Sequence, residues 1–389
     1  MVRLFVTGDN HFGKKYDRYP DVKDILIESR FESFREMVHK AEAEECDMFV
    51  ITGDLFDNIS TIKKSDVERI VDILSEFNGD VLVLPGNHDY YTGDEKVWKT
   101  FKNALLNVDH NITLLNEFRK YCFDVGDEKV NIYPAYCQSK HSGDNNLEWI
   151  KNETIDKSNG INIGIAHGAI EGVTPDLNGE YFMMSERELN EISMDVWLIG
   201  HTHIPYPNDL KENEDVTGYR IFNAGTHEQT DLHNNTVGNC FIVSVEKMDG
   251  VSKVYARRYI SGKMRYFDLK INVSPDNDAA LRNAILREIE AKEKNAVIRC
   301  RISGVIKQSE YEDRNLIYKE ILSSFLSYEV DDSELSEEIS PEKVCSEFAE
   351  TSFAAMYIER FYDNPTELQM AYQLMCQCRE HSGDMSRTF

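Results

Sequence analysis

The sequence predicts an α/β fold in which strands and helices form layers, and three observations support this prediction. First, five short apolar runs rich in β-branched residues have the length and composition of buried strands. Second, the stretches between the early runs show the 3.6-residue apolar period of amphipathic helices. Third, strands and helices alternate along the chain, as is typical of layered α/β domains. The five runs are residues 4–6, 48–51, 81–84, 163–166 and 196–199.

Two helices are predicted from their apolar faces, which lie between the first three runs. The first face holds Phe31, Phe34, Met37, Val38 and Ala41, and the second holds Val67, Ile70, Val71, Leu74 and Phe77. We expect both faces to pack against the chain's own sheet, with a dimer surface as the alternative use. Later strands at 218–222, 239–245 and 253–259 look like antiparallel additions that complete a sheet. The core domain is therefore expected to span residues 1–262.

A small α/β cap is expected over residues 263–308, and a helical tail over 309–389. In the cap, strands at 266–273 and 297–302 flank a helix that Ser274-Pro275 would open, with an inward face of Leu281, Ala284, Ile285 and Ile289. In the tail, the acidic stretch 329–338 is expected to be a flexible linker. Helices starting at Ser340-Pro341 and Asn364-Pro365 follow it. They show no obvious core of their own, so they either fold back on the main domain or dock on a partner.

Composition limits the possible functions. The net charge is −26, from 69 acidic and 43 basic residues among 389, and such a surface repels phosphate backbones. The chain is therefore not expected to bind nucleic acid unaided. The sequence shows no secretory leader and no stretch near the roughly 20 apolar residues that cross a bilayer, so we expect a cytoplasmic protein without a membrane partner. The eight cysteines lack paired spacing and are expected to be reduced thiols.

A short polar cluster follows each of the five apolar runs. The clusters are Asp9-Asn10-His11, Gly53-Asp54, Gly86-Asn87-His88-Asp89, His167-Gly168 and Gly200-His201-Thr202-His203. They contain five of the eleven histidines, three carboxylates and the amide of Asn87, a ligand set that suits manganese, iron or zinc rather than thiol-selecting metals. Seven or more such ligands exceed the need of a single ion. Two ions about 3.5–4 Å apart, bridged by a carboxylate, would use them all.

The spacing within the clusters supports this prediction to different degrees. In an extended segment, residues i and i+2 point the same way, so Asp9 and His11 can share an ion. His201 and His203 have the same spacing, although a bend at Thr202 could aim them at different ions. A lone Asp-x-His or His-x-His is commonplace in loops, and the Gly-Asn-His-Asp cluster after Pro85 is a sharper signal. The five clusters in this order, each after a strand, indicate a metal site.

In this series the chain resembles the calcineurin-like metallophosphoesterase superfamily, over roughly its first 225 residues. The resemblance implies a four-layer α/β/β/α sandwich that holds two divalent metal ions, expected to be Mn²⁺. Carried over position by position, one ion would be bound by Asp9, His11 and His203, the other by Asn87, His167 and His201, and Asp54 would bridge them. His88 would be the catalytic histidine, assisted by Asp89.

The order of the predicted parts is most similar to that of the SbcD nuclease family, the bacterial form of the meiotic recombination eleven family. This resemblance implies a DNA exonuclease and endonuclease, the nuclease subunit of a double-strand-break repair complex. Its expected partners are DNA, a second copy of the chain, and an SMC-like coiled-coil ATPase of the SbcC type, gripped by the terminal helices. The ATPase could supply the basic surface that the chain lacks. The segment 223–226 departs from the family's Pro-Gly-Ser turn, and the resemblance assigns His227 no role.

Two other functions remain open on the sequence. One is a stand-alone phosphodiesterase or phosphatase on small nucleotides, which predicts full activity without a partner. The other is an adaptor with a vestigial site, in which the tail helices are the active part.

Overall fold

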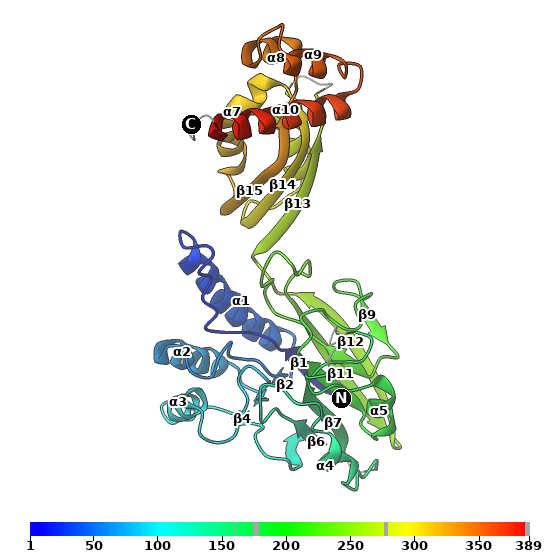
Figure 1. Ribbon diagram of the computed structural model, residues 1–389. Helices are drawn as coiled ribbons and strands as arrows, with labels where there is room; N and C mark the ends of the chain where they lie inside the picture. Colours follow the sequence, from blue (N-terminus) through cyan, green and yellow to red (C-terminus); the bar gives the residue numbers. More distant parts are fainter. Residues whose placement is uncertain (159, 174–178, 276–278, 386–389) are drawn as a thin grey trace. The chain divides into compact units, whose positions relative to one another are not determined.

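The computed structural model describes residues 1–158, 160–173, 179–275 and 279–385, and it divides into two compact units (Figure 1). The first unit is Met1–Phe267 with Asn295–Val297, and the second is Asp268–Lys294 with the chain from Ile298 onward. The predicted core domain, 1–262, falls within the first unit. The predicted tail, 309–389, and most of the predicted cap fall within the second, apart from residues 276–278 and 386–389, which lie outside the described residues.

A seven-stranded sheet forms the centre of the first unit. Its strands in spatial order are β4 (Ile112–Leu114), β3 (Asp80–Val83), β2 (Met48–Ile51), β1 (Val2–Thr7), β11 (Asn239–Met248), β12 (Val251–Ile260) and β9 (Asp215–Thr217). Strands β1 to β4 are parallel, as expected of continuous apolar runs buried on both faces. Strand β11 pairs antiparallel with β1 and with β12, which confirms the two predicted antiparallel additions at 239–245 and 253–259.

A five-stranded sheet lies beside it. Its spatial order is β10 (Ile221–Asn223), β8 (Val196–Gly200), β7 (Ile161–His167), β6 (Glu128–Ala135) and β5 (Tyr121–Val125). Only β5 runs antiparallel to its neighbour. The predicted antiparallel strand at 218–222 is therefore wrong in direction, because β10 pairs parallel to β8.

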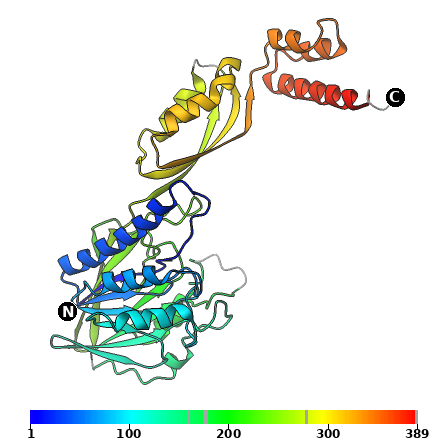
Figure 2. The same ribbon diagram turned by 90° about the vertical axis from the view of Figure 1, so that its left-hand side faces the viewer.

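Apolar cores formed by the described residues separate the layers. Helices α1 (Lys23–Ala43), α2 (Lys64–Leu74) and α3 (Lys96–Leu105) pack on one face of the seven-stranded sheet, as Figure 2 shows. The second core lies between the two sheets. The third joins the five-stranded sheet to α4 (Glu148–Lys151) and α5 (Glu186–Glu191). The predicted α/β class is confirmed. Phe34 and Ile70 are fully buried against the sheet, so these faces of α1 and α2 pack internally, as expected.

The second unit contains a three-stranded sheet in the order β13 (Arg265–Val273), β14 (Ala296–Ile306) and β15 (Ser327–Glu337), with helices α6 (Ala280–Ile289) and α7 (Gln308–Leu322). The predicted inward face of α6 is buried. The acidic stretch 329–338 was expected to be a flexible linker, and this is wrong, because nearly all of it belongs to β15. Basic side chains pair with two of its carboxylates: Asp332 accepts a hydrogen bond from Arg314 at 3.0 Å, and Glu337 pairs with Lys343.

Three terminal helices follow: α8 (Pro341–Glu347), α9 (Phe353–Glu359) and α10 (Pro365–Met385). The Ser340 hydroxyl caps α8 by accepting from the Lys343 amide, so the predicted start at Ser340-Pro341 is confirmed. The expectation that these helices lack a core is wrong, because they share a small one that includes Val344, Ile358 and Leu368. Within the described part of the chain, no helix has both the length and the apolar character needed to span a membrane.

Candidate metal centre

The predicted ligands come from strand ends in both sheets of the first unit. Asp9, Asp54 and Asn87 follow β1, β2 and β3 of the seven-stranded sheet, while His167 ends β7 and His201 follows β8 of the other sheet. All five side chains face one small region, because their polar atoms lie within a few ångströms of one another, as the contacts below show. The prediction that strand ends bring the clusters together is thus met by the topology.

One group of donor atoms consists of Asp9, His11 and His203. Their ligand atoms all lie within 4.8 Å of one another. Nε2 of His11 lies 2.9 Å from Nε2 of His203. Two ring nitrogens at this distance either share one proton or face a common cation. This is the arrangement expected of the three residues that the sequence assigned to one ion, and the assignment itself stays a prediction.

Asp54 lies between this group and the second one. One oxygen of its carboxylate is 3.4 Å from Nε2 of His167 and 3.9 Å from Nε2 of His11. The other oxygen accepts a hydrogen bond of 2.8 Å from the backbone amide of His88. A carboxylate in contact with histidines from both predicted ion sites is placed where a bridging ligand would have to be.

The second group is built around Asn87. Its amide oxygen lies 3.0 Å from Nε2 of His167 and 3.0 Å from Nδ1 of His201. Two outer contacts orient these ligands: Asn87 Nδ2 donates to the Lys140 carbonyl at 3.4 Å, and Nδ1 of His167 lies 2.9 Å from the Thr52 carbonyl. Because a carbonyl only accepts, His167 carries its proton on Nδ1 and presents Nε2 to the centre.

The backbone at the ligands is strained. Asp9 and His11 both have φ of 47°, Asp54 has φ of 52° and His201 has φ of 102°. A non-glycine residue in this left-handed region costs about 1–3 kcal/mol and persists only where its surroundings hold it. Four of the seven predicted ligands have this strained conformation. This indicates that the loop conformations serve to orient the ligand side chains, at some expense of stability.

Two glycines let the loops approach closely. A Cβ on Gly86 would lie 2.2 Å from the Asp54 carboxylate and 2.8 Å from the His167 ring. A Cβ on Gly53, which has φ of 109°, would lie 2.1 Å from Nδ1 of His167. The glycines in the predicted motifs therefore bring His167 against the loop of Asp54, at a distance that no other residue allows.

Burial of several carboxylates creates a demand for positive charge. Burial raises the pKa of Asp9 to about 8 against the opposing charge of His167, and the like charges of Asp54 and Asp89 add to the rise. Burial and the charge of Asp54 also raise the pKa of Asp89 to about 7. For Asp54 burial acts in the same direction, but His167 outweighs it and the pKa is lowered. Buried carboxylates with imidazole and amide ligands fit a pair of divalent cations.

His88 and Asp89 make different contacts from those expected of a histidine and its assistant. Nδ1 of His88 lies 3.0 Å from the backbone carbonyl of Asp57, and its ring stands edge-on to His11 at 4.8 Å between ring centres. The buried Asp89 carboxylate accepts from the amides of Gly86 and Phe56, at 2.6 and 3.0 Å. Asp89 thus braces the backbone of two ligand loops. Its assistance to His88 stays a prediction.

Sequence reasoning missed Asp57. Its carboxylate lies 3.4 Å from Nδ1 of His11, and it forms a second compact group with His11 and His88. Burial would raise its pKa, but the close contact with His11 and the charges of His11 and Lys14 outweigh this effect, so the pKa is lowered. The only sequence signal was its position three residues after Asp54, in a loop that already carried a ligand.

His227, which had no role in the sequence analysis, supports the first ligand loop. It is fully buried; its Nδ1 lies 3.1 Å from the Asn10 side-chain amide and its Nε2 lies 3.1 Å from the Arg30 carbonyl. Burial and the charge of Arg30 hold the pKa of His227 well below its usual range. A neutral ring that donates from Nε2 and accepts at Nδ1 fixes Asn10, which stands between two predicted ligands.

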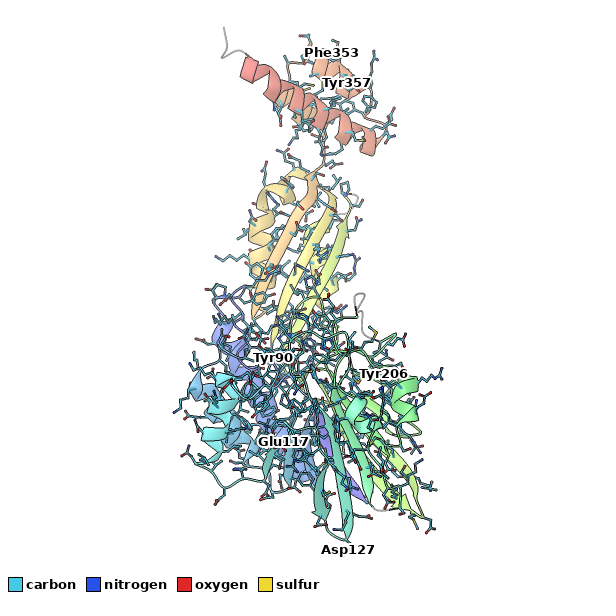
Figure 3. All side chains as sticks on the ribbon, turned by 60° about the horizontal axis from the view of Figure 1, so that its bottom comes forward. Tyr90, Glu117, Asp127, Tyr206, Phe353 and Tyr357 are labelled. Atoms are coloured by element: carbon cyan, nitrogen blue, oxygen red, sulfur yellow. The ribbon has the colours of Figure 1, made fainter. Side chains whose placement is uncertain are left out.

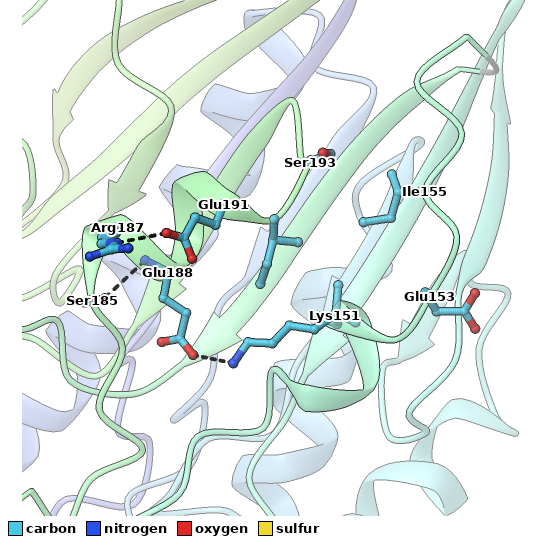
Figure 4. Close-up of a pocket in the computed structure, with 10 residues that line it drawn as sticks. Lys151, Glu153, Ile155, Ser185, Arg187, Glu188, Glu191 and Ser193 are labelled. Atoms are coloured by element: carbon cyan, nitrogen blue, oxygen red, sulfur yellow. Dashed lines mark hydrogen bonds and ion pairs between the residues drawn. The ribbon is translucent and has the colours of Figure 1, made fainter.

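A separate pocket lies on the outer side of the five-stranded sheet, between α4 and α5 (Figure 4). It has a volume of about 650 Å³, and its lining comes from residues 150–155 and 185–193. Its charges are paired with one another: Lys151 contacts Glu188 at 2.6 Å and Arg187 contacts Glu191 at 2.8 Å. These pairs leave Glu153 as the remaining charged residue of the lining, and the predicted ligands lie elsewhere, so we assign this pocket no function.

Comparison with known proteins agrees with the composition of the centre. A sequence model described as calcineurin-like phosphoesterase matches residues 2–205, just over half of the chain. An uncharacterised metallophosphoesterase of Bacillus subtilis, YhaO, is 26% identical over 180 residues, which are 46% of this chain and 42% of that protein. The chain thus matches less than half of the length of this relative.

Solved structures with a similar course of the chain include two phosphoesterases. The calcineurin-like phosphoesterase YfkN from Bacillus subtilis has a TM-score of 0.39 and 14% identity, covering 67% of this chain and 90% of that chain. A dimetal phosphatase from Danio rerio has a TM-score of 0.34 and 12% identity, covering 67% of this chain and 99% of that chain.

Proposed function

The chain belongs to the calcineurin-like phosphoesterase family, whose members hydrolyse phosphoester bonds with two divalent metal ions, and from this premise we propose that it is a DNA nuclease that works with Mn²⁺. Hydrolysis at a dimetal centre follows from the family. DNA as the substrate, the identity of the metal, a second copy of the chain and an ATPase as partners are the proposal. It rests on the centre described above and on the second unit.

In the proposed site, Asp9, His11 and His203 would hold one ion, Asn87, His167 and His201 would hold the other, and Asp54 would be shared. When bound, the ions would supply a nucleophile from water at neutral pH and neutralise the charge that develops on the phosphate. The protein keeps these ligands in place through the Thr52 and Lys140 carbonyls and through the left-handed backbone at four positions. The ligands are therefore preorganised.

His88 is the proposed proton donor. Its Nδ1 donates to the Asp57 carbonyl at 3.0 Å, which leaves Nε2 as the ring atom that can give a proton to the leaving oxygen of a cleaved diester. Its backbone amide is held by the Asp54 carboxylate, so the ring is fixed next to the shared ligand without being one. This placement suits a group that acts on the substrate and does not bind the metal.

The observation that carries the choice of DNA is the second unit. It supplies none of the predicted ligands, so it is not needed to form the hydrolytic centre and is expected to have another role, such as binding a partner. Its terminal helices expose large apolar side chains, among them Phe353 on α9, which is labelled in Figure 3 and is 72% exposed, and Met370 on α10, which is 66% exposed. A groove of about 430 Å³ lined by Tyr357, Phe361 and Leu374 lies between these helices. Clustered apolar exposure of this kind marks a protein-binding surface.

We propose that this groove binds the coiled coil of an SMC-like ATPase of the SbcC type. The groove would take the apolar face of a helix. A basic partner surface would also resolve the conflict between a net charge of −26 and a DNA substrate. The proposed homodimer must use a surface other than the buried faces of α1 and α2.

The charge also favours a second function, a stand-alone phosphodiesterase or phosphatase on small nucleotides. A net charge of −26 repels a polyanion far more than a single nucleotide, so without a partner the small substrate is the easier one.

The test compares Mn²⁺-dependent cleavage of linear duplex DNA with hydrolysis of bis(p-nitrophenyl) phosphate, with and without the ATPase. His88→Ala should abolish DNA cleavage, while His39→Ala, at an exposed site on α1, should leave it unchanged. Met370→Glu in the groove should lose stimulation by the ATPase, while Met248→Glu, at a more exposed position in the first unit, should keep it. Diester hydrolysis without DNA cleavage, even with the ATPase, would support the small-nucleotide function instead.

A further inference from the structure

A cation that the sequence analysis did not single out lies beside the metal centre. Lys14 is three residues beyond His11 on the same loop, and its backbone amide donates to the His11 carbonyl at 3.3 Å. The side chain is half-buried, whereas the next residue, Lys15, is exposed. Gly13 between them and the ligand has φ of 96°, a turn that folds the chain back along the loop. The backbone of Lys14 therefore lies next to the ligand loop, and its side chain is partly open to solvent.

The charge of Lys14 reaches the residues around the centre. Together with burial and the neighbouring His11, it lowers the pKa of His203 well below its usual value. It also contributes to the lowered pKa of Asp57. The ammonium group thus acts electrostatically on the part of the centre that holds His203 and Asp57, next to the loop of His11.

The ammonium group lacks the partner that such a position would ordinarily require. Across residues 1–158, 160–173, 179–275 and 279–385, no carboxylate lies within 4.0 Å of it. Asp57 and Asp231 act on it only from a longer range, while burial and Arg30 lower its pKa. In a chain with 69 acidic residues, a half-buried lysine without an ion pair is unexpected, because burying a charge is costly unless an anion compensates it.

We infer that Lys14 binds a phosphate group of the substrate that flanks the one being cleaved. The cleaved phosphate is expected to bind the ions, and in the described residues the Lys14 side chain makes no hydrogen bond or ion pair with a predicted ligand. The Lys14 ammonium group, next to the centre, would bind the phosphate one nucleotide away along the strand. Lys14 thereby selects substrates with at least two phosphates. This inference rests on the proposed diesterase activity, and it applies to DNA and to short nucleotides alike.

The test uses two dinucleotides that share one cleavable diester, thymidylyl-thymidine with and without a 5′ phosphate, and a labelled DNA oligonucleotide. Steady-state kinetics with Mn²⁺ are measured for the wild type, Lys14→Gln, Lys14→Arg and the control Lys15→Gln. We expect Lys14→Gln to raise KM about tenfold for the phosphorylated dinucleotide, the effect of losing one charge-assisted hydrogen bond, and to leave the unphosphorylated one unchanged. For the oligonucleotide, the slope of log KM against log salt should fall by about 1.

Lys14→Arg keeps the charge and should stay within about threefold of the wild type. Melting temperatures of all variants identify any that are misfolded. Equal losses on both dinucleotides, or equal effects of Lys14→Gln and Lys15→Gln, would overturn the inference. Hydrolysis of the dinucleotides without cleavage of DNA, even when the ATPase is added, would refute the nuclease and leave the comparison of the two dinucleotides as the test of Lys14.

Discussion

The backbone amide of His201 donates to both carboxylate oxygens of Asp9, at 3.0 Å from each, across 192 positions of sequence. Asp9 follows a strand of the seven-stranded sheet and His201 follows a strand of the five-stranded one. The first and the last predicted ligand clusters are therefore held together by the protein itself, before any ion is considered. The positions of the two predicted ion sites are fixed by this link.

Asp9→Asn should cost the protein one of its ions. The new amide keeps one oxygen but turns its NH₂ group toward a site built for a carboxylate, so the charge and one acceptor are lost. We expect metal affinity to fall by at least about 100-fold, the upper end of what loss of a supporting contact costs. Elemental analysis after dialysis measures the ions per chain. The control is Asp127→Asn, at an exposed hairpin tip (Figure 3); full occupancy in Asp9→Asn would remove Asp9 from the ligands.

Asp57→Ala should weaken metal binding without removing a ligand. Its carboxylate holds Nδ1 of His11 at 3.4 Å, whereas its contact with His88 uses the backbone carbonyl, which alanine retains. We expect about a 10- to 100-fold loss in metal affinity, with activity restored at saturating Mn²⁺. Activity is measured as a function of Mn²⁺ concentration. A fall in kcat that excess metal does not reverse would show that the carboxylate acts on the substrate instead.

Gly86→Ala should destabilise the first unit and inactivate the centre. The added Cβ would lie 2.2 Å from the Asp54 carboxylate and 2.4 Å from its backbone nitrogen, and backbone cannot move aside cheaply. Overpacking of this kind costs about 1–3 kcal/mol. The control is Gly143→Ala, whose Cβ would meet its nearest neighbour at 3.8 Å. Chemical unfolding and metal titration of both variants check the prediction, and wild-type behaviour of Gly86→Ala would contradict the loop contacts described above.

Asp268→Asn should flatten the acid side of the stability profile. Hydrogen bonds from Arg299, opposed by slight burial, and the charges of Arg299 and Arg301 hold the pKa of Asp268 below its usual value. A depressed carboxyl pKa stabilises the fold above the unfolded value near 3.8, and this stabilisation is lost as the pH falls through the lower folded value. At neutral pH we expect the variant to be less stable by about 1–2 kcal/mol.

The measurement is the difference in melting temperature between wild type and Asp268→Asn at pH 7 and at pH 2.5. The difference should be large at pH 7 and shrink toward zero at the lower pH. Asp313→Asn, at an exposed position of α7, serves as the control and should show no such trend. A constant difference at both pH values would mean that the charge of Asp268 contributes nothing.

Much of the centre could be predicted because strand ends have a strong local signature. The apolar runs before Asp9, Asp54 and Asn87 are core strands, and the histidines after the later runs reach the same region. The supporting role of Asp57 could not be predicted, because it depends on a contact with His11 that only the folded loops create. No local pattern distinguishes it from any other loop aspartate.

The errors share a physical cause. The acidic run at 329–338 has the composition of a linker, and only its neighbours in the fold, such as Arg314 and Lys343, make a strand of it. The direction of β10 likewise depends on its pairing with β8 in a second sheet. Tertiary partners override local preference most easily in charged and short segments, where that preference is weak.

Because the ligands are divided between the two sheets, bound ions would link one sheet to the other. Their affinity would therefore depend on how the apolar core holds the two sheets together. Leu82 of one sheet and Ile163 of the other both belong to that core. By thermodynamic linkage, if correct packing of the two sheets increases metal affinity, metal binding increases the free energy needed to separate the sheets by the same amount. Metal affinity in this protein is therefore also a gauge of how well two layers of apolar side chains fit together.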